Sequence, residues 1–325
     1  MERILLIAAS VMFDLLFGDP YWLYHPVRLI GTAISGITKQ MKKICRRDRG
    51  VHAKREIAAG GVLAFVVIIG TYGITAGILY AAARIYEVFG IVLAVFWAYQ
   101  ILAAKCLKTE TDKVWTDLMH GDLKKARISI SYLVGRDTGS LSEEEVAKAC
   151  VETIAENTTD GVIAPLFYLF IGGVPLGMAY KAVNTLDSMV GYRNEEFEYL
   201  GKISAKIDDI ANYIPARLAA WAMFAVGVCL RFDWKNAWKT YLADRKAHLS
   251  PNCGQTESVA AGALRVQLGG THDYFGKPVV KPTIGQALER CSYEKIKDAQ
   301  KLMFGSLLIC IAVFSFVFFG ISRFL

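Results

Sequence analysis

The sequence lacks the short motifs that mark most soluble enzymes. It contains no G-x-x-x-x-G-K-[ST] phosphate loop, no G-x-G-x-x-G fingerprint, no H-E-x-x-H and no G-x-S-x-G. Its seven cysteines are scattered and include no C-x-x-C pair. Neither a disulfide framework nor a cysteine zinc site is therefore indicated, and any nucleotide must bind without the usual phosphate loop.

Charged residues are also scarce, and long apolar runs take their place. They make up 21% of the 325 residues, against 54% hydrophobic residues, and the mean hydropathy is +0.34. Six runs approach the length of about 20 residues that a helix needs to cross a bilayer. They are Ile4–Gly18, Ala58–Ala83, Ile85–Leu107, Val162–Tyr180, Ile214–Leu230 and Leu302–Gly320. We therefore predict an all-α, polytopic integral membrane protein with five to six hydrophobic helices, forming one catalytic domain over residues 1–325.

Basic residues crowd between the first two apolar runs. Eight lysines and arginines lie in Lys39–Arg55, whereas the next connector has only Arg84. By the positive-inside rule this loop faces the cytoplasm, which places the protein in the cell membrane. No aromatic residues interleave with these charges, so nucleic acid is not an expected partner. We interpret the first run as a retained anchor and not as a signal peptide.

Three polar blocks separate the apolar runs. We predict helices in 108–161, with breaks at Gly121 and Gly135–Gly139 and with a capping box that opens the helix Glu143–Glu156. Residues 181–213 also read as helix, broken around Gly191 and Gly201, whereas the glycines and prolines of 244–285 predict loops.

The run Val162–Tyr180 contains several helix breakers. It holds Pro165, Gly172, Gly173, Pro175 and Gly177. If every apolar run spanned the bilayer, blocks 108–161 and 181–213 would lie on opposite sides. Broken helices are tolerated where they are buried in protein or line a polar cavity. We therefore predict a broken or re-entrant segment here, and expect that Ile214–Leu230 does not span cleanly either. The polar blocks then form one cytoplasm-facing site.

Three carboxylates form a stripe on one predicted helix. Glu152, Glu156 and Asp160 are spaced at i, i+4 and i+8, within about 80° of arc. Like charges at this spacing destabilise a helix, so a counter-charge is expected. It is either a basic side chain or Mg²⁺, which prefers carboxylate oxygens together with substrate phosphates. A solvated acidic face is the alternative.

Other polar residues complete the candidate site. Lys181, Asn184 and Ser188 share one helix face, with Asp187 close by; the lysine either meets a phosphate or reaches to the membrane interface. Asp14 is costly inside an apolar run and so marks a functional site. The remaining candidates are Asp19, His25, Arg136, Asp137, Asn157, Asp208, Asp209, Asn212, Arg217, His248, Ser250 and Asn252. Taken singly, His25 also fits a turn or packing role.

These motifs together resemble the adenosylcobinamide-phosphate synthases, membrane enzymes of cobalamin biosynthesis. The resemblance extends over about 240 residues in the same order. It rests on Asp14-x-x-x-Gly18-Asp19-Pro20 with His25-Pro26-Val27, Gly121–Leu123, Val134–Thr138, Val151–Gly161, Tyr180–Met189, Asp208–Asn212 with Pro215-Ala216-Arg217, and His248–Asn252. One departure is Cys253–Glu257, where a small residue is expected at 253 and a proline near 256.

The resemblance implies an ATP- and Mg²⁺-dependent amide ligase. It would join a propionate carboxyl of adenosylcobyric acid to aminopropanol or its O-phosphate, through an acyl phosphate. Under this hypothesis the carboxylate stripe holds Mg²⁺, and Lys181, Arg136 and Arg217 meet phosphates. His25 or Asp187 then accepts the proton of the amine. Other corrinoid-assembly enzymes and a second copy of the chain stay open as partners.

Two other classes of protein fit parts of the pattern. A transporter would suit the broken apolar segments and Asp14. A non-catalytic sensor of related fold would be expected to lose the carboxylate and lysine motifs, which are all present here. One assay distinguishes the three classes. Formation of an amide product that depends on ATP and corrin indicates an enzyme, and flux without product indicates a transporter. The absence of both product and flux indicates a sensor.

The basic loop gives the first testable prediction. We expect Lys39–Arg55 to face the cytoplasm and the amino terminus to face the other side, because positive charge is retained on the cytoplasmic side. A protease or cysteine-labelling map of intact cells measures this. Labelling within this loop by an impermeant reagent added outside would contradict it.

Overall fold

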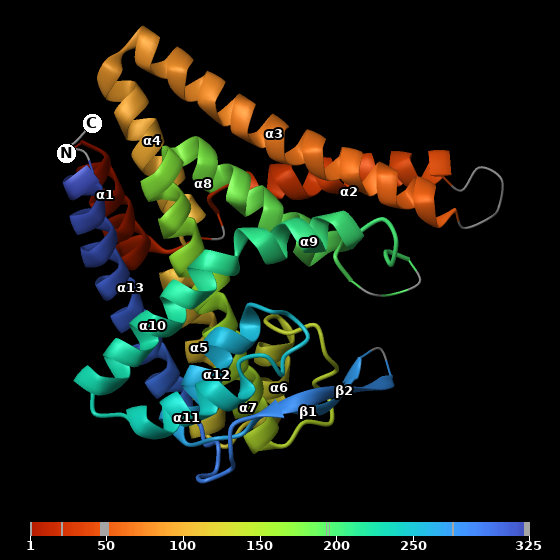
Figure 1. Ribbon diagram of the computed structural model, residues 1–325, viewed down its shortest axis with the longest axis vertical. Coiled ribbons are helices and arrows are strands. Elements are labelled where there is room, and N and C mark those ends of the chain that lie inside the picture. Colours follow the sequence, from red (N-terminus) through yellow and green to blue (C-terminus); the bar gives the residue numbers. More distant parts are fainter. Residues whose placement is uncertain are drawn as a thin grey trace. The chain divides into compact units, whose positions relative to one another are not determined.

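The computed structural model describes residues 2–20, 22–45, 52–192, 194, 196–274 and 276–321, and helices dominate it (Figure 1). Arg46, Arg47 and Arg49 of the predicted cytoplasmic loop lie outside the described residues. The helices are α1 (Glu2–Phe17), α2 (Pro26–Cys45), α3 (Ala53–Ile85), α4 (Glu87–Ile101), α5 (Ala104–Met119), α6 (Leu123–Ser131), α7 (Glu143–Asn157), the π-helix η1 (Thr158–Ile163), α8 (Ala164–Val190), α9 (Lys202–Ala211), α10 (Tyr213–Cys229), α11 (Trp234–Asp244), α12 (Cys253–Leu264) and α13 (Glu294–Ile321); β1 (Leu268–Tyr274) and β2 (Lys277–Ile284) form a hairpin.

Four helical segments are long and apolar enough to cross a membrane. Among the described residues they are Ala53–Ile85, Glu87–Met119, Glu143–Val190 and Glu294–Ile321. The first apolar run forms α1, which has only 16 residues, and the fifth forms α10, with 17. Both are shorter than the usual spanning length. The prediction of an all-α polytopic membrane protein is confirmed.

The chain divides into two compact units, each assembled from segments that are distant in sequence. Unit 1 comprises Met1–Leu102, Ala164–Asn212 and Phe318–Leu325, and unit 2 comprises Ala103–Ile163 and Tyr213–Val317. The single catalytic domain expected from the sequence stays a prediction.

The core of unit 1 forms where α2, α3 and α8 pack together. Ile34, Leu63, Ala182 and Leu186 are fully buried there, and burial of each large aliphatic side chain stabilises the fold by about 1.5–3 kcal/mol. Gly60 of α3 permits the closest approach, since a Cβ atom at this position would lie 2.0 Å from the main-chain oxygen of Leu200. The small residue therefore fixes the position of the segment that leads into α9.

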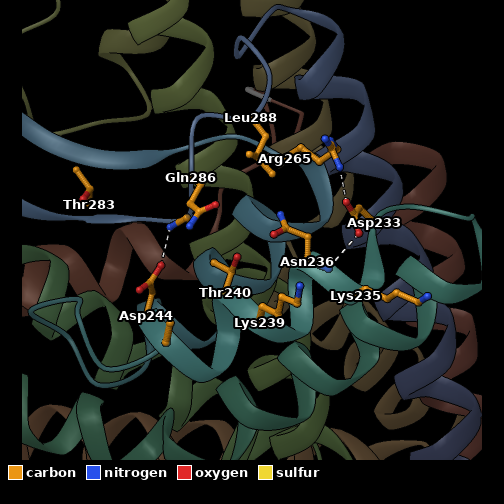
Figure 2. A pocket seen from close by; sticks show the side chains of 12 residues that line it. Asp233, Lys235, Asn236, Lys239, Thr240, Asp244, Arg265, Thr283, Gln286 and Leu288 are labelled. Carbon is orange, nitrogen blue, oxygen red and sulfur yellow. Dashed lines mark hydrogen bonds and ion pairs between the residues drawn. The ribbon is translucent and has the colours of Figure 1, made fainter.

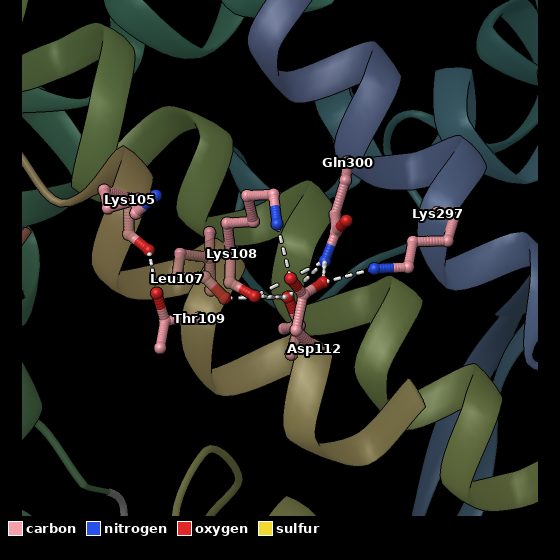
Figure 3. Close-up of polar contacts among 8 residues, drawn as sticks. Lys105, Leu107, Lys108, Thr109, Asp112, Lys297 and Gln300 are labelled. Carbon is pink, nitrogen blue, oxygen red and sulfur yellow. Dashed lines mark hydrogen bonds and ion pairs between the residues drawn. The ribbon is translucent and has the colours of Figure 1, made fainter. Parts of the chain in front are cut away.

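A polar network joins α5 to α13 in unit 2 (Figure 3). Asp112 accepts hydrogen bonds from Lys108, from Lys297 at 2.6 Å and from Gln300 at 2.7 Å. The Gln300 amide also donates to the Thr111 hydroxyl at 2.9 Å. The buried polar side chains between α5 and α13 are thus paired with one another, as burial requires.

Several local predictions are confirmed. Ser142 and Glu145 form the capping box that opens α7, and a positive φ of 72° at Gly121 separates α5 from α6. The helix through 181–213 is interrupted between Val190 and Lys202. In each case the sequence signal is local, so tertiary packing does not override it.

The run Val162–Tyr180 is broken, as predicted. It begins within η1, and Gly173 has φ 66° and ψ −160°, ahead of Pro175 inside α8. A second interruption follows α4, where the main-chain N–H of Ala103 donates to the carbonyl of Gly161 at 3.0 Å. Irregular backbone in an apolar chain is stable only when its polar groups find such partners.

The prediction that 244–285 is loop-rich was wrong in two places. Residues 253–264 form α12, every residue of which after Cys253 is buried, and 268–284 form the antiparallel hairpin. Within α12, Gly254 and Gly262 are positions of close contact rather than helix breakers. At Gly262 of α12 a Cβ would lie 2.5 Å from the Cα of Ala237 in α11, so only glycine allows this packing.

Burial also changes the design of the labelling experiment. Cys45, the native cysteine of the basic segment, is only 6% exposed, and an absent label there would carry no information. Lys39 is exposed on α2. A Lys39→Cys variant is therefore the appropriate labelling site.

Gly173 provides a prediction for folding. Its backbone conformation is essentially restricted to glycine, and Gly173→Ala should destabilise the protein by about 1–3 kcal/mol. The measurement is thermal unfolding of the purified protein in detergent. Gly77→Ala, in a helical position where a Cβ meets nothing within 4 Å, serves as control and should be neutral or stabilising by about 0.5–1 kcal/mol. Equal stability of the two variants would contradict the assigned backbone break.

Candidate functional site

The carboxylate stripe of unit 2 begins with a buried ion pair. The Arg136 guanidinium lies 2.7 Å from Glu152 Oε2, and its side chain is only 3% exposed. The other oxygen of Glu152 accepts a hydrogen bond from the main-chain N–H of Gly269 at 2.7 Å. The counter-charge expected from the sequence is therefore Arg136, which precedes α7 in the sequence.

Three glutamates from α7 and α12 lie within electrostatic range of one another. Cys253 Sγ donates to Glu156 Oε1 at 3.3 Å, and Glu257 is 5% exposed, with His248 Nε2 at 3.9 Å. Burial raises the pKa of Glu257 well above its usual value, and the charges of Glu152 and Glu156 raise it further. Sequence reasoning missed Glu257 as a site residue, although the density of polar side chains from His248 onward contained the signal.

Two histidines flank these carboxylates. Burial lowers the pKa of His248, with Glu156 opposing, and its Nδ1 accepts from the main-chain N–H of Ser250 at 3.0 Å. His272 of β1 was not predicted. It is 8% exposed and lies against the main chain of Gly269. Burial and the Arg136 charge lower its pKa.

The stripe does not form a preformed metal cage. Among the described residues no group of three or more His, Cys, Asp or Glu side chains is placed to hold a metal ion. Both oxygens of Glu152 are already engaged by Arg136 and Gly269. Magnesium often takes only one or two carboxylates plus substrate phosphates, and so the assignment of Glu152, Glu156 and Asp160 to Mg²⁺ stays a prediction.

A cavity of about 490 Å³, here called the basic pocket, lies beside His248. The Arg217 guanidinium stacks over the Tyr213 ring at 3.5 Å and that of Arg245 over the Tyr241 ring at 4.9 Å. No carboxylate is among its described lining residues, which are Tyr213, Arg217, Tyr241, Arg245, Lys246, His248, Leu249, Pro251 and Gln255. The pocket therefore suits an anion, and arginine suits phosphate oxygens in particular.

A second cavity, of about 690 Å³, lies on the other face of α11 (Figure 2). Lys239 lines this cavity and Tyr241 the basic pocket, and two residues along a helix point about 200° apart. Here the acids are engaged: Asp233 binds Arg265 and caps α11, and Asp244 accepts from the N–H of Gly285. Its mixed charges suit a polyanion less well.

In unit 1, residues near the amino terminus meet α8. His25 Nε2 lies 3.7 Å from Asp19, and its Nδ1 accepts from the N–H of Val27 at 3.1 Å. Burial lowers the pKa of His25; Asp19 opposes this effect, and Lys181 adds to it. Asp14 of α1 is 1% exposed. His25, Asp19 and Lys181 therefore lie within electrostatic range of one another; their catalytic roles stay predictions.

Other predicted residues of unit 1 connect α9 to α8. The Tyr180 hydroxyl donates to Asn212 Oδ1 at 2.8 Å, and the Asn212 amide donates to Asp208 at 3.1 Å. Asp208 is buried and Asp209 half-buried, as expected for adjacent positions on a helix. On α8, Ser188 donates to the main-chain oxygen of Asn184.

The remaining predicted residues belong to unit 2. Asp137 holds the hairpin, since it accepts from the N–H of Gly276 at 2.7 Å, and Asn157 donates to the carbonyl of Thr153. Ser250 accepts from the N–H of Asn252, which precedes α12. The predicted site residues therefore fall into two groups, one in each unit, with His25, Asp187 and Lys181 in unit 1 and the carboxylate stripe in unit 2.

The fold and these clusters define a polytopic helical membrane protein with buried acid–base groups and a cavity lined by basic residues. Residues 7–303 match the family described as "CobD/Cbib protein". The chain belongs to this family.

Curated relatives cover almost the whole chain. It is 45% identical to "Cobalamin biosynthesis protein CobD" of Listeria monocytogenes serotype 4b (strain F2365), over 97% of this chain and 98% of the relative. It is 45% identical to the CobD protein of Geobacter metallireducens, over 92% of both chains, and 43% identical to "Cobalamin biosynthesis protein CbiB" of Salmonella arizonae, over 93% of both. No solved structure matches the chain.

Glu257 generates a prediction about pH. Its raised pKa means that the folded state favours the protonated form. The associated stability is present at acid pH and is lost as pH rises through the folded-state pKa, at a slope of up to about 1.4 kcal/mol per pH unit. Glu257→Gln should therefore be more stable than wild type at pH 8 and show a flatter profile of Tm against pH.

The control variant, Glu289→Gln, should change stability in the opposite direction. Lys295 lowers the pKa of Glu289, so Glu289→Gln should lose stability at neutral pH rather than gain it. If Glu257→Gln is less stable than wild type at pH 8, Glu257 is ionised and well solvated in the folded protein, and the burial assigned to it is contradicted.

Proposed function

We propose that the protein is an ATP-dependent amide ligase of cobalamin biosynthesis. It joins aminopropanol or its O-phosphate to a propionate carboxyl of adenosylcobyric acid, giving adenosylcobinamide or its phosphate. Membership of the CobD/CbiB family and the names of the relatives support the pathway. The basic pocket is the observation that carries the chemistry, because its described lining residues offer a phosphate-bearing substrate three cations and no acid.

The reaction requires two transfers. The propionate oxygen attacks the γ-phosphorus of ATP, and ADP leaves; the amine nitrogen then attacks the acyl carbon, and inorganic phosphate leaves. Each step depends on placing phosphate oxygens against positive charge more than on a protein nucleophile. Magnesium bound to ATP would neutralise phosphate charge; the steps assigned to this chain use only its own side chains.

The basic pocket would bind phosphate through preoriented arginines. Stacking on Tyr213 and Tyr241 restricts the Arg217 and Arg245 side chains, so less conformational entropy is lost when a ligand binds. Two guanidinium groups can each present two parallel N–H donors to phosphate oxygens. Arg217 was predicted from sequence, whereas Arg245 and Lys246 were not.

The attacking ammonium must lose a proton, and His25 and Asp187 are the acceptors expected from the sequence. His25 Nδ1 already accepts from the N–H of Val27, and protonation there would break this contact. That geometry favours Asp187, the other predicted acceptor, on the same helix as Lys181. Since the cell's ATP is cytoplasmic, the proposed site faces the cytoplasm from the cell membrane.

Transport is the second candidate, and the broken helices favour it. Interrupted segments such as α8 at Gly173 bind substrates in many transporters. Flux of corrinoid into proteoliposomes without amide product would support transport against the ligase.

The basic pocket generates a prediction for catalysis. Purified protein in detergent should convert ATP, adenosylcobyric acid and the amine to amide product with matching release of ADP. Arg217→Gln and Arg245→Gln should each raise the KM of the phosphate-bearing substrate about ten- to a hundredfold, because each removes a charge-assisted hydrogen bond worth about 1.5–3 kcal/mol.

The matched control is Lys239→Gln. It removes one positive charge from the other face of α11, and it should leave KM near the wild-type value. Equal effects of all three substitutions would indicate a general electrostatic effect and contradict the assigned pocket. Absence of product from the wild type, with both amines, would contradict the ligase.

A further inference from the structure

Gln100 is a buried amide whose polar atoms are unsatisfied. It is 2% exposed on α4, and among the described residues neither its Nε2 nor its Oε1 has a hydrogen-bond partner. It lies five residues before Lys105, the first charged residue after Glu87. A buried polar group left unpaired costs about 1–3 kcal/mol. Few native side chains carry this cost on both polar atoms without a reason.

Gln300 shows what a structural glutamine looks like in the same chain. It is 4% exposed on α13, and its Nε2 donates to Asp112 and Thr111 (Figure 3). The two residues have the same side chain and similar burial, but Gln300 lies in the charged first turns of α13, whereas Gln100 lies in the apolar helix α4. They differ in that the bonds of Gln300 hold two helices together, whereas the amide of Gln100 bonds to none of the described residues.

Gln100 adjoins the polar cluster of unit 1. His25 hydrogen-bonds to its main-chain carbonyl, and α4 packs against both α1 and α8, which carry Asp14 and Lys181. The main chain of Gln100 therefore lies beside His25, one of the two candidate proton acceptors.

A carboxamide is the ligand group that best satisfies both the Nε2 and the Oε1 of Gln100. Paired amides satisfy a carbonyl oxygen and an N–H at once, through two parallel hydrogen bonds. A phosphate would satisfy only Nε2, and an ammonium only Oε1. Of the substrates in the proposed function, the corrin is the one that carries carboxamides, on the side chains around its ring.

We propose that Gln100 is a substrate-binding residue that pairs with a side-chain carboxamide of the corrin; this inference rests on the proposed function. The proposal predicts that one substitution affects corrin binding and folding stability differently. Gln100→Leu removes both unpaired polar atoms at similar volume, and so it leaves folding stability unchanged or increased. Corrin affinity falls about ten- to a hundredfold, as expected for the loss of two hydrogen bonds.

The experiment measures equilibrium binding of adenosylcobyric acid, followed by its visible absorbance without ATP, together with thermal unfolding of the same detergent-purified protein. Gln100→Leu should weaken binding without lowering Tm, and Gln300→Leu should lower Tm while the folded fraction binds as wild type. A corrin with carboxylates in place of its carboxamides should bind wild type and Gln100→Leu equally weakly.

The outcomes distinguish the two claims. If the wild type binds adenosylcobyric acid and Gln100→Leu binds it equally well, this inference is overturned and the proposed function stands. A drop in Tm for Gln100→Leu as large as that for Gln300→Leu overturns the inference in favour of a structural role, such as a bond to a buried water. If the wild type binds no corrin, both the inference and the proposed function fail.

Discussion

The requirement that main-chain polar groups be satisfied within an apolar chain governs much of this structure. Wherever the backbone leaves the helical ladder, another group must take its hydrogen bonds. The break after α4 is stable because the N–H of Ala103 reaches the carbonyl of Gly161 in η1, and the break at Gly173 uses a conformation open to glycine alone. Polar residues cluster near these interruptions: Gln100 precedes one, and Asp160 lies within the π-helix.

The same constraint acts on side chains, and it explains the carboxylate stripe. Like charges on one helix face are tolerated because Arg136, held with little exposure, neutralises Glu152. Glu257 adds a further carboxyl from α12, and the burial that raises its pKa favours a proton there over a third negative charge. An acid-rich centre of this kind can therefore change its net charge by one proton at Glu257.

Local signals in the sequence predicted local structure well. The Ser142–Glu145 capping box, the glycine break at Gly121 and the interruption of Val162–Tyr180 depend on neighbouring residues and are all present. Glycines of the last polar block were misread because their role is tertiary: Gly262 is small to let α12 contact α11, which no window of sequence reveals. The pairing of Arg136 with Glu152 could be expected as a counter-charge, but its identity depends on the fold.

The residues that sequence reasoning missed share one property. Their neighbours in space are set by the fold and cannot be read from neighbouring positions in the sequence. Arg245 and Lys246 were not among the predicted site residues. Tyr241 of α11 and Arg245, directly after this helix, line the basic pocket, whereas Lys235 and Lys239 lie on the opposite face of α11. One short helix thereby separates a cavity with no acid among its described lining residues from one whose acids are already engaged. Of these two cavities, the basic pocket has the larger excess of positive over negative charge among its described lining residues, so its electrostatic potential is the more favourable one for an anion.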